Sequence, residues 1–244
     1  MHMSALRKFV TSFLVISLLL VANESLARRR PPAGGRLAIV VDERLSALRA
    51  TPELSGVLLR RIGRGNYVAI KGEKRGRDGV SFYKVNLTSR TSGWIQREAV
   101  VSPSRPGDDD RLLRLIKASD DYDRVMRARI FLDNFSSSEL RPEVLLIYSQ
   151  TAEEIAGRLS REAMRRLDAE EMNAGGAPVF SYFLNYNGLD RYNRQGVTFI
   201  FDAREKALHY DGEGWQELIH RYPRSLQAAE ARKILAARPN QTRQ

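Results

Sequence analysis

The sequence predicts a mixed chain of two domains, a small antiparallel β-barrel followed by an α-helical domain. Between residues 45 and 100, short apolar or β-branched runs alternate with glycine, proline and aspartate, which is typical of a small antiparallel sheet. From Arg111 onward, leucine and isoleucine recur at three- and four-residue spacing, as an amphipathic helix requires. Residues 102–110 combine prolines, glycine and three consecutive aspartates, so we place the domain boundary there.

The N-terminal region has the features of a secretory signal. Arg7 and Lys8 precede the apolar run 9–22, and Ser25-Leu26-Ala27 ends it with small residues. We therefore expect cleavage before Arg28 and a periplasmic or extracellular protein; an uncleaved anchor is the alternative. The predicted organisation is a signal peptide at 1–27, a flexible basic linker at 28–35, the barrel at 36–102, a linker at 103–110, the helical domain at 111–238 with an insert at 173–211, and a tail at 239–244.

Composition limits the chemistry and the partners. The chain has no cysteine, which excludes disulfides, cysteine-ligated zinc and a thiol nucleophile. Its formal net charge is +11, and it becomes +10 without Arg7, Lys8 and Glu24 of the signal. This balance favours anionic surfaces, although export and the lack of aromatic–basic interleaving argue against nucleic acid. The alternative is that the charges are only solvated surface.

Within the predicted barrel, the strand around residues 80–87 has two unlike faces. Tyr83, Val85 and Leu87 form the more consistently apolar set and are expected to face the core. Trp94 follows Gly93 at the start of a strand, and we expect it to close the barrel core. The alternative is that Trp94 lines a peptide groove.

Two sets of residues are therefore candidates for ligand binding in the barrel. One is aromatic, and the other is the basic stretch from residue 71 to residue 77, expected at a tip between strands, where exposed charge would meet an anionic partner. The candidates are Tyr67, Phe82, Trp94, Lys71, Lys74, Arg75 and Arg77.

The order of these elements, ending in Ser92-Gly93-Trp94-Ile95, resembles the bacterial SH3-like (SH3b) family. That resemblance implies a domain that binds and does not catalyse. Many exported members are joined to Cys–His cell-wall peptidases, and the absence of cysteine sets this chain apart from those.

The helical region is predicted to hold helices at 143–167, 214–222 and 225–237. The segment 215–231, in which a helix ends in an aromatic residue before a short serine-containing turn, resembles the helical hairpin of tetratricopeptide-like repeats in exported envelope proteins. A weak echo of it begins at residue 130, and the offset between the copies is no multiple of the repeat length of about 34 residues. In the insert, residues 197–201 are predicted as a strand, with residues 178–183 as the candidate hairpin partner.

The sequence gives little support for catalysis, so no catalytic residue, metal ligand or cofactor is predicted. His209 and His220 lack metal-binding spacing, and no phosphate-binding loop or nucleophile motif is present. The acidic pairs at 120–121 and 153–154 are adjacent in sequence and are expected to be solvated. The segment Asp190–Arg194 is a polar–aromatic cluster, interpreted as a surface loop.

The favoured function is that of a non-enzymatic adaptor of the cell envelope. The SH3-like domain would bind cell-wall peptide or protein, and the helical domain would bind a protein partner. The alternatives are an envelope enzyme with its active site in the insert 173–211, and a wall-binding sensor module without a protein partner.

Overall fold

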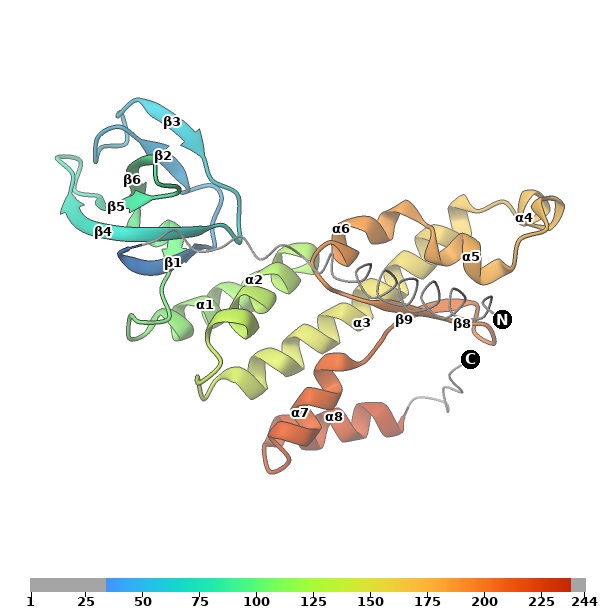
Figure 1. Ribbon diagram of the computed structural model, residues 1–244. Helices are drawn as coiled ribbons and strands as arrows, with labels where there is room; N and C mark the ends of the chain where they lie inside the picture. The colour runs from blue at the N-terminus through green and yellow to red at the C-terminus, as the bar shows by residue number, and fades with distance from the viewer. Residues whose placement is uncertain (1–33, 238–244) are drawn as a thin grey trace, which may run out of the picture. The chain divides into compact units, whose positions relative to one another are not determined.

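The computed structural model describes residues 34–237, and this part of the chain contains both an antiparallel sheet and a set of helices (Figure 1). The predicted signal peptide, most of the basic linker and the tail lie outside the described residues. The strands of the first sheet are β1 (Arg36–Val40), β2 (Ala47–Arg49), β3 (Leu58–Arg61), β4 (Tyr67–Arg75), β5 (Ser81–Asn86), β6 (Ser92–Gln96) and β7 (Val100–Val101). The mixed fold class is thereby confirmed.

The seven strands lie in the order β3-β2-β6-β5-β4-β1-β7, and every neighbouring pair is antiparallel. The sheet does not close, so β3 and β7 are its two ends. Its core is formed by aliphatic side chains together with Tyr83. Tyr83 and Val85 are buried as the alternation predicts, and Leu87 packs against the same core half-buried.

The helices follow the sheet in the chain and match the predicted periodicity in most places. They are α1 (Asp108–Lys117), α2 (Asp121–Asn134), α3 (Arg141–Arg166), α4 (Ala169–Gly175), α5 (Val179–Leu184), α6 (Asp190–Asn193), α7 (Glu213–Arg221) and α8 (Leu226–Ala236), with short 3-10 turns at Arg97–Ala99 and Asn187–Leu189. The pairs α2–α3 and α7–α8 pack together as helical hairpins. The two similar sequence segments therefore have the same local structure, in which one helix ends, a short turn follows and the next helix begins.

The insert differs from its prediction. Strand β8 (Phe199–Asp202) pairs with β9 (Ala207–Tyr210), whereas the expected partner, residues 178–183, lies almost wholly in helix α5. Asp202 stabilises the turn between β8 and β9, because its carboxylate accepts hydrogen bonds from the backbone N–H groups of Arg204 and Glu205. Strand β9 packs on α3, as Figure 1 shows.

The sheet and the helices share contacts beyond the chain connection. Ile39, Val41 and Val101 belong to the same hydrophobic cluster as the helix residues. Near the predicted linker, Asp108 accepts the backbone N–H of Ser102 at 2.8 Å, and Arg111 donates to the backbone oxygen of Glu98 at 3.0 Å. The described residues 34–237 accordingly belong to one compact unit.

Candidate functional site

A row of exposed and half-buried side chains crosses four strands at one end of the sheet. The strand register pairs Leu58 of β3 with Arg49 of β2, Arg49 with Trp94 of β6, and Trp94 with Lys84 of β5. Directly opposite residues of antiparallel strands point to the same face. The four side chains therefore form one strip, with an aliphatic residue at the edge, an indole near the middle and two cations.

Local contacts hold this strip in place. The Lys84 ammonium lies 5.8 Å from the centre of the Trp94 ring, in cation–π geometry. The Arg49 guanidinium donates to the backbone oxygen of Gly56 at 2.8 Å. A Cβ at Gly93 would come within 2.8 Å of the Arg49 carbonyl oxygen, so only glycine lets β2 approach β6 this closely.

The expectation that Trp94 closes the core is wrong. Its neighbours Gly93 and Ile95 are buried, whereas Trp94 is only half-buried. Side chains alternate along a strand, so Ile95 takes the core position and the indole takes the opposite face. Trp94 thus remains a candidate for binding, where an indole supplies a large, rigid contact surface.

The other two aromatic candidates are less accessible to a ligand. Phe82 is fully buried, although alternation places it on the same face as Lys84. Tyr67 is half-buried and donates its hydroxyl to Asn134 of α2 at 3.1 Å. Tyr67 therefore takes part in the contact between the sheet and the helices.

The basic candidates are exposed, as predicted, but most of them stand in strand β4 and not in a tip. Only Arg77 lies in the turn, where it pairs with Glu53 at 2.7 Å. Arg75 donates to the backbone oxygen of Gly79. Lys71 and Lys74 have no ion pair within residues 34–237, and Lys74 lies opposite Phe82, on the same face as Trp94. The structure thus brings Trp94 and Lys74 onto one face; sequence reasoning overlooked Arg49 and Leu58.

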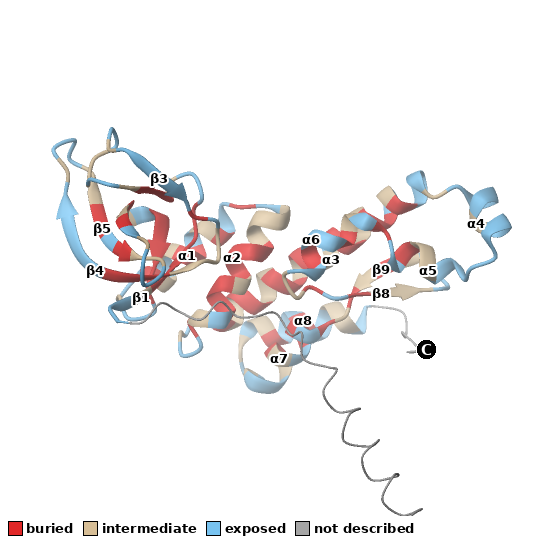
Figure 2. Ribbon diagram, turned by 45° about the horizontal axis from the view of Figure 1, so that its top comes forward, coloured by how far each residue is buried: buried red, intermediate tan, exposed pale blue. Residues whose placement is uncertain are grey.

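Next to the strip, the end strand β3 is exposed along its whole length (Figure 2). The loop before it and the strand itself present aliphatic side chains to solvent. Their exposed fractions are 46% for Leu54, 70% for Val57, 47% for Leu58 and 51% for Leu59. Isolated exposed aliphatic residues are ordinary, whereas three consecutive ones at 57–59, with Leu54 in the loop before them, indicate a contact surface.

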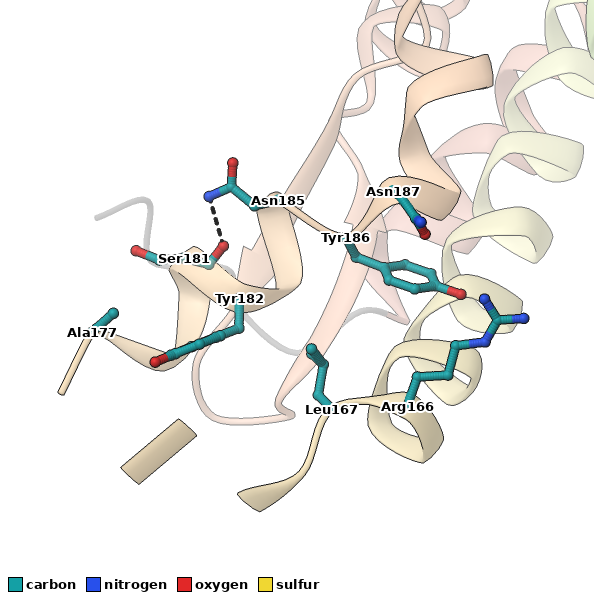
Figure 3. Close-up of a pocket in the computed structure, with 8 residues that line it drawn as sticks. All are labelled: Arg166, Leu167, Ala177, Ser181, Tyr182, Asn185, Tyr186 and Asn187. Atoms are coloured by element: carbon teal, nitrogen blue, oxygen red, sulfur yellow. Dashed lines mark hydrogen bonds between the residues drawn. The ribbon is translucent and has the colours of Figure 1, made fainter. Parts of the chain in front are cut away.

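A pocket of about 610 Å³ lies in the helical region, between the end of α3 and α5 (Figure 3). The Arg166 guanidinium lies 5.9 Å from the centre of the Tyr186 ring, which forms the pocket wall. The lining consists of Arg166, Leu167, Ala177, Ser181, Tyr182, Asn185, Tyr186 and Asn187. It offers a cation, amides and hydroxyls that suit hydrogen bonding, and no carboxylate or imidazole that would activate Ser181.

The polar–aromatic cluster of the insert lies at the surface, as interpreted, but it begins with the short helix α6 and one of its side chains, Tyr192, is buried. The fully buried Tyr192 donates its hydroxyl to Asp121 at 2.7 Å and accepts a hydrogen bond from Arg158 at 2.7 Å. Burial raises the pKa of the Tyr192 hydroxyl. Asp121 adopts φ +43°, a conformation that residues other than glycine rarely take, and these bonds hold it.

In each of the acidic pairs 120–121 and 153–154, one carboxylate forms hydrogen bonds within the protein, contrary to the expectation that both pairs are solvated. Besides Asp121, Glu153 accepts from the backbone N–H of Tyr210 and lies 2.8 Å from His209 Nδ1. The other ring nitrogen of His209 lies 2.9 Å from Glu205. The hydrogen bond to Glu153 is the main reason why the pKa of His209 is raised.

Neither metal ligation nor similarity to known proteins assigns a function to the described residues. Residues 34–237 hold no group of three or more His, Cys, Asp or Glu side chains placed to bind a metal. In the same part of the chain, no helix has the length and apolar character needed to span a membrane. Comparisons with family models, curated proteins and solved structures find no match to this chain.

Proposed function

We propose that this chain is an exported, non-enzymatic binding protein of the bacterial cell envelope. In this proposal the sheet is an SH3-like domain that holds a cell-wall peptide or a protein segment, and the helical region, of tetratricopeptide type, engages a protein partner. The observation that carries it is the strip of Leu58, Arg49, Trp94 and Lys84 across four strands.

The chemistry of this strip suits a peptide that carries carboxylates. An indole next to an ammonium and a guanidinium offers both apolar contact and attraction for anions, and peptides of the cell wall and acidic protein segments both present carboxylates. Arginine can bind a carboxylate through two parallel hydrogen bonds, which adds orientation to attraction. The formal charge of +10 after signal removal works in the same direction.

Export is the second part of the proposal, and it rests on the order of charged, apolar and small residues at the N-terminus. Mass spectrometry of the protein from its native host is expected to show a chain that begins at Arg28. Protein with an intact Met1 would contradict a cleaved signal and leave the N-terminus as an anchor.

The binding test uses residues 31–244, because they contain all of the described residues, which belong to one compact unit. Purified peptidoglycan sacculi and, separately, soluble envelope proteins of the native host are mixed with the wild type and with Trp94→Ala. We expect one of the two fractions to retain the wild type. The affinity of that fraction for Trp94→Ala is expected to be at least about tenfold lower, equivalent to about 1.4 kcal/mol. Leu226→Ala is the control, because Leu226 is 85% exposed on α8, far along the chain from the strip.

Two results would count against the proposal. Equal retention of wild type and Trp94→Ala would remove the strip from the binding surface. Absence of retention by both fractions would remove the adaptor function. If the wild type instead chemically converts a component of either fraction, and substitutions of Ser181 and its neighbours abolish this activity, the alternative of an enzyme in the insert is favoured.

A further inference from the structure

The two end strands of the sheet differ in their burial. At one end, both residues of β7 are buried, and β7 contacts α1. At the other end, all four residues of β3 are exposed, and β2 is its only strand neighbour within residues 34–237. A strand with one free edge presents unpaired backbone N–H and C=O groups to which another strand can bind.

The backbone of β3 has groups available for such pairing. The backbone N–H of Ile62 donates to the backbone oxygen of Ser46, the residue before β2, so the backbone groups of Arg61, which lies opposite Ala47, point away from β2. Natural proteins usually protect such edges with short strands, charges, proline or a covering helix. β3 is short and carries Arg60 and Arg61, but Val57, Leu58 and Leu59 also expose an apolar run at this edge, which indicates a contact surface.

Charge identifies the kind of segment that covers it. Arg60 and Arg61 have no ion pair or side-chain hydrogen bond within residues 34–237, and residues 57–61 contain no acidic side chain. The given residues outside the described part are poor in acidic side chains: residues 1–33 contain a single one, Glu24, and residues 238–244 contain none. A second copy would bring another pair of arginines to the same edge in a protein that is already strongly basic.

We propose that β3 captures an extended segment of another protein, with alternating acidic and apolar residues, which adds to the sheet as an eighth strand. This inference rests on the proposed binding function and names its partner chemistry. Backbone hydrogen bonds to the free edge supply part of the affinity. Carboxylates on one face of the segment meet Arg60, which lies opposite Leu48, and apolar side chains on the other face meet Leu58, which lies opposite Arg49 in the strip with Trp94.

The probe is a synthetic eight-residue peptide of alternating glutamate and valine with both ends capped. We expect it to bind residues 31–244 and to slow amide hydrogen exchange at residues 58–61. A peptide of the same sequence with methyl groups on alternate backbone nitrogens keeps the side chains but cannot pair along one edge. We expect methylation on the pairing edge to weaken binding at least about tenfold, since backbone pairing is then lost.

Charge reversal at Arg60→Glu with Arg61→Glu is expected to weaken binding about tenfold or more and to reduce its salt dependence. The matched control is Arg165→Glu with Arg224→Glu, which makes the same change in net charge at two exposed arginines of the helical region. If the control weakens binding equally, the attraction is general and not local to β3, and the inference is wrong.

The remaining outcomes separate this inference from the proposed function. Binding that is unaffected by backbone methylation would overturn strand addition while leaving the strip as a binding surface. Failure of the acidic peptide to bind, alongside retention of the wild type by an envelope fraction, would overturn the partner chemistry alone. A concentration-dependent dimer, broken by the Arg60 and Arg61 variant, would show that a second copy covers β3 and would equally overturn it.

Discussion

Replacing Arg127 by alanine is expected to destabilise the sheet and the helices together. Arg127 stands on α2 and is only 6% exposed. Its Nε donates to the backbone oxygen of Val41 at 3.2 Å, and its Nη1 donates to the Ser119 hydroxyl. One guanidinium therefore links the end of β1 with the turn between α1 and α2.

The expected loss of stability follows from the polar groups that Arg127→Ala leaves without the guanidinium as a donor. The Val41 oxygen loses the guanidinium as a donor, and the Ser119 hydroxyl loses one of its partners. An unsatisfied buried polar group costs about 1–3 kcal/mol, and the missing side chain adds a cavity. Burial is also the main reason why the pKa of Arg127 is lowered, so removing the charge relieves part of its desolvation cost. We expect the free energy of unfolding to fall by about 2–4 kcal/mol.

The two tryptophans provide separate reporters for the assay. Trp94 lies in the sheet, and Trp215 is 1% exposed on α7. Single-tryptophan proteins made with Trp94→Phe or Trp215→Phe are unfolded in urea and followed by fluorescence. If sheet and helices form one cooperative unit, Arg127→Ala lowers the free energy of unfolding by the same amount in both single-tryptophan proteins.

Arg114→Ala is the control, because Arg114 on α1 is exposed and a surface substitution usually changes stability by no more than about 0.5 kcal/mol. Unfolding of the wild type, which keeps both tryptophans, in two separate steps would refute the reasoning. So would a shift that Arg127→Ala causes in the Trp94 transition alone. Either result would favour the independent domains that the sequence predicts on the two sides of residues 103–110.

Three further substitutions test other parts of the structure. Ile95→Ala is expected to cost about 2–5 kcal/mol in urea unfolding, because Ile95 is fully buried, and Trp94→Ala to cost clearly less; the reverse order would place the indole in the core. His209 has a raised pKa, so its contribution to stability is complete below the ordinary value of 6.5 and is lost as pH rises through the raised value; a pH series of melting temperatures should show this loss in the wild type and not in His209→Gln. Gly214→Ala would place a Cβ 2.4 Å from the Ser149 hydroxyl oxygen, so we expect α7 to loosen from α3, and an unchanged melting temperature would contradict this close approach.

Much of the helical region could be predicted from the sequence, because apolar spacing alone determines an amphipathic helix. The prediction for residues 143–167 matches α3, which ends at Arg166, and the two C-terminal helices match α7 and α8 within a residue or two. The prediction for residues 178–183 was wrong because a short apolar run fits either a strand or a helix turn. The helix is consistent with Pro178, which can stand directly before a first helical turn, and with Phe183, which packs against Phe201.

The candidate site was less predictable, because it depends on which residues lie opposite each other across strands. The position of Trp94 on the face opposite the core follows from alternation once Ile95 is known to be buried, but the sequence permits either assignment. Nothing in the sequence near Arg49 or Leu58 marks them as neighbours of Trp94. Their proximity is a consequence of strand order, in which β2 lies between β3 and β6.

An irregularity in β3 brings Leu58 into the strip. The register between β2 and β3 shifts at Leu48/Arg49, so that Leu48 lies opposite Arg60 while Arg49 lies opposite Leu58. Such a bulge sets two residues against one and changes which side chain faces which way. In regular pairing, continued from Leu48 and Arg60, Leu59 and not Leu58 would stand opposite Arg49. A shift of one residue moves a side chain to the other face, so the bulge decides which leucine stands beside Arg49 and Trp94 at the free edge.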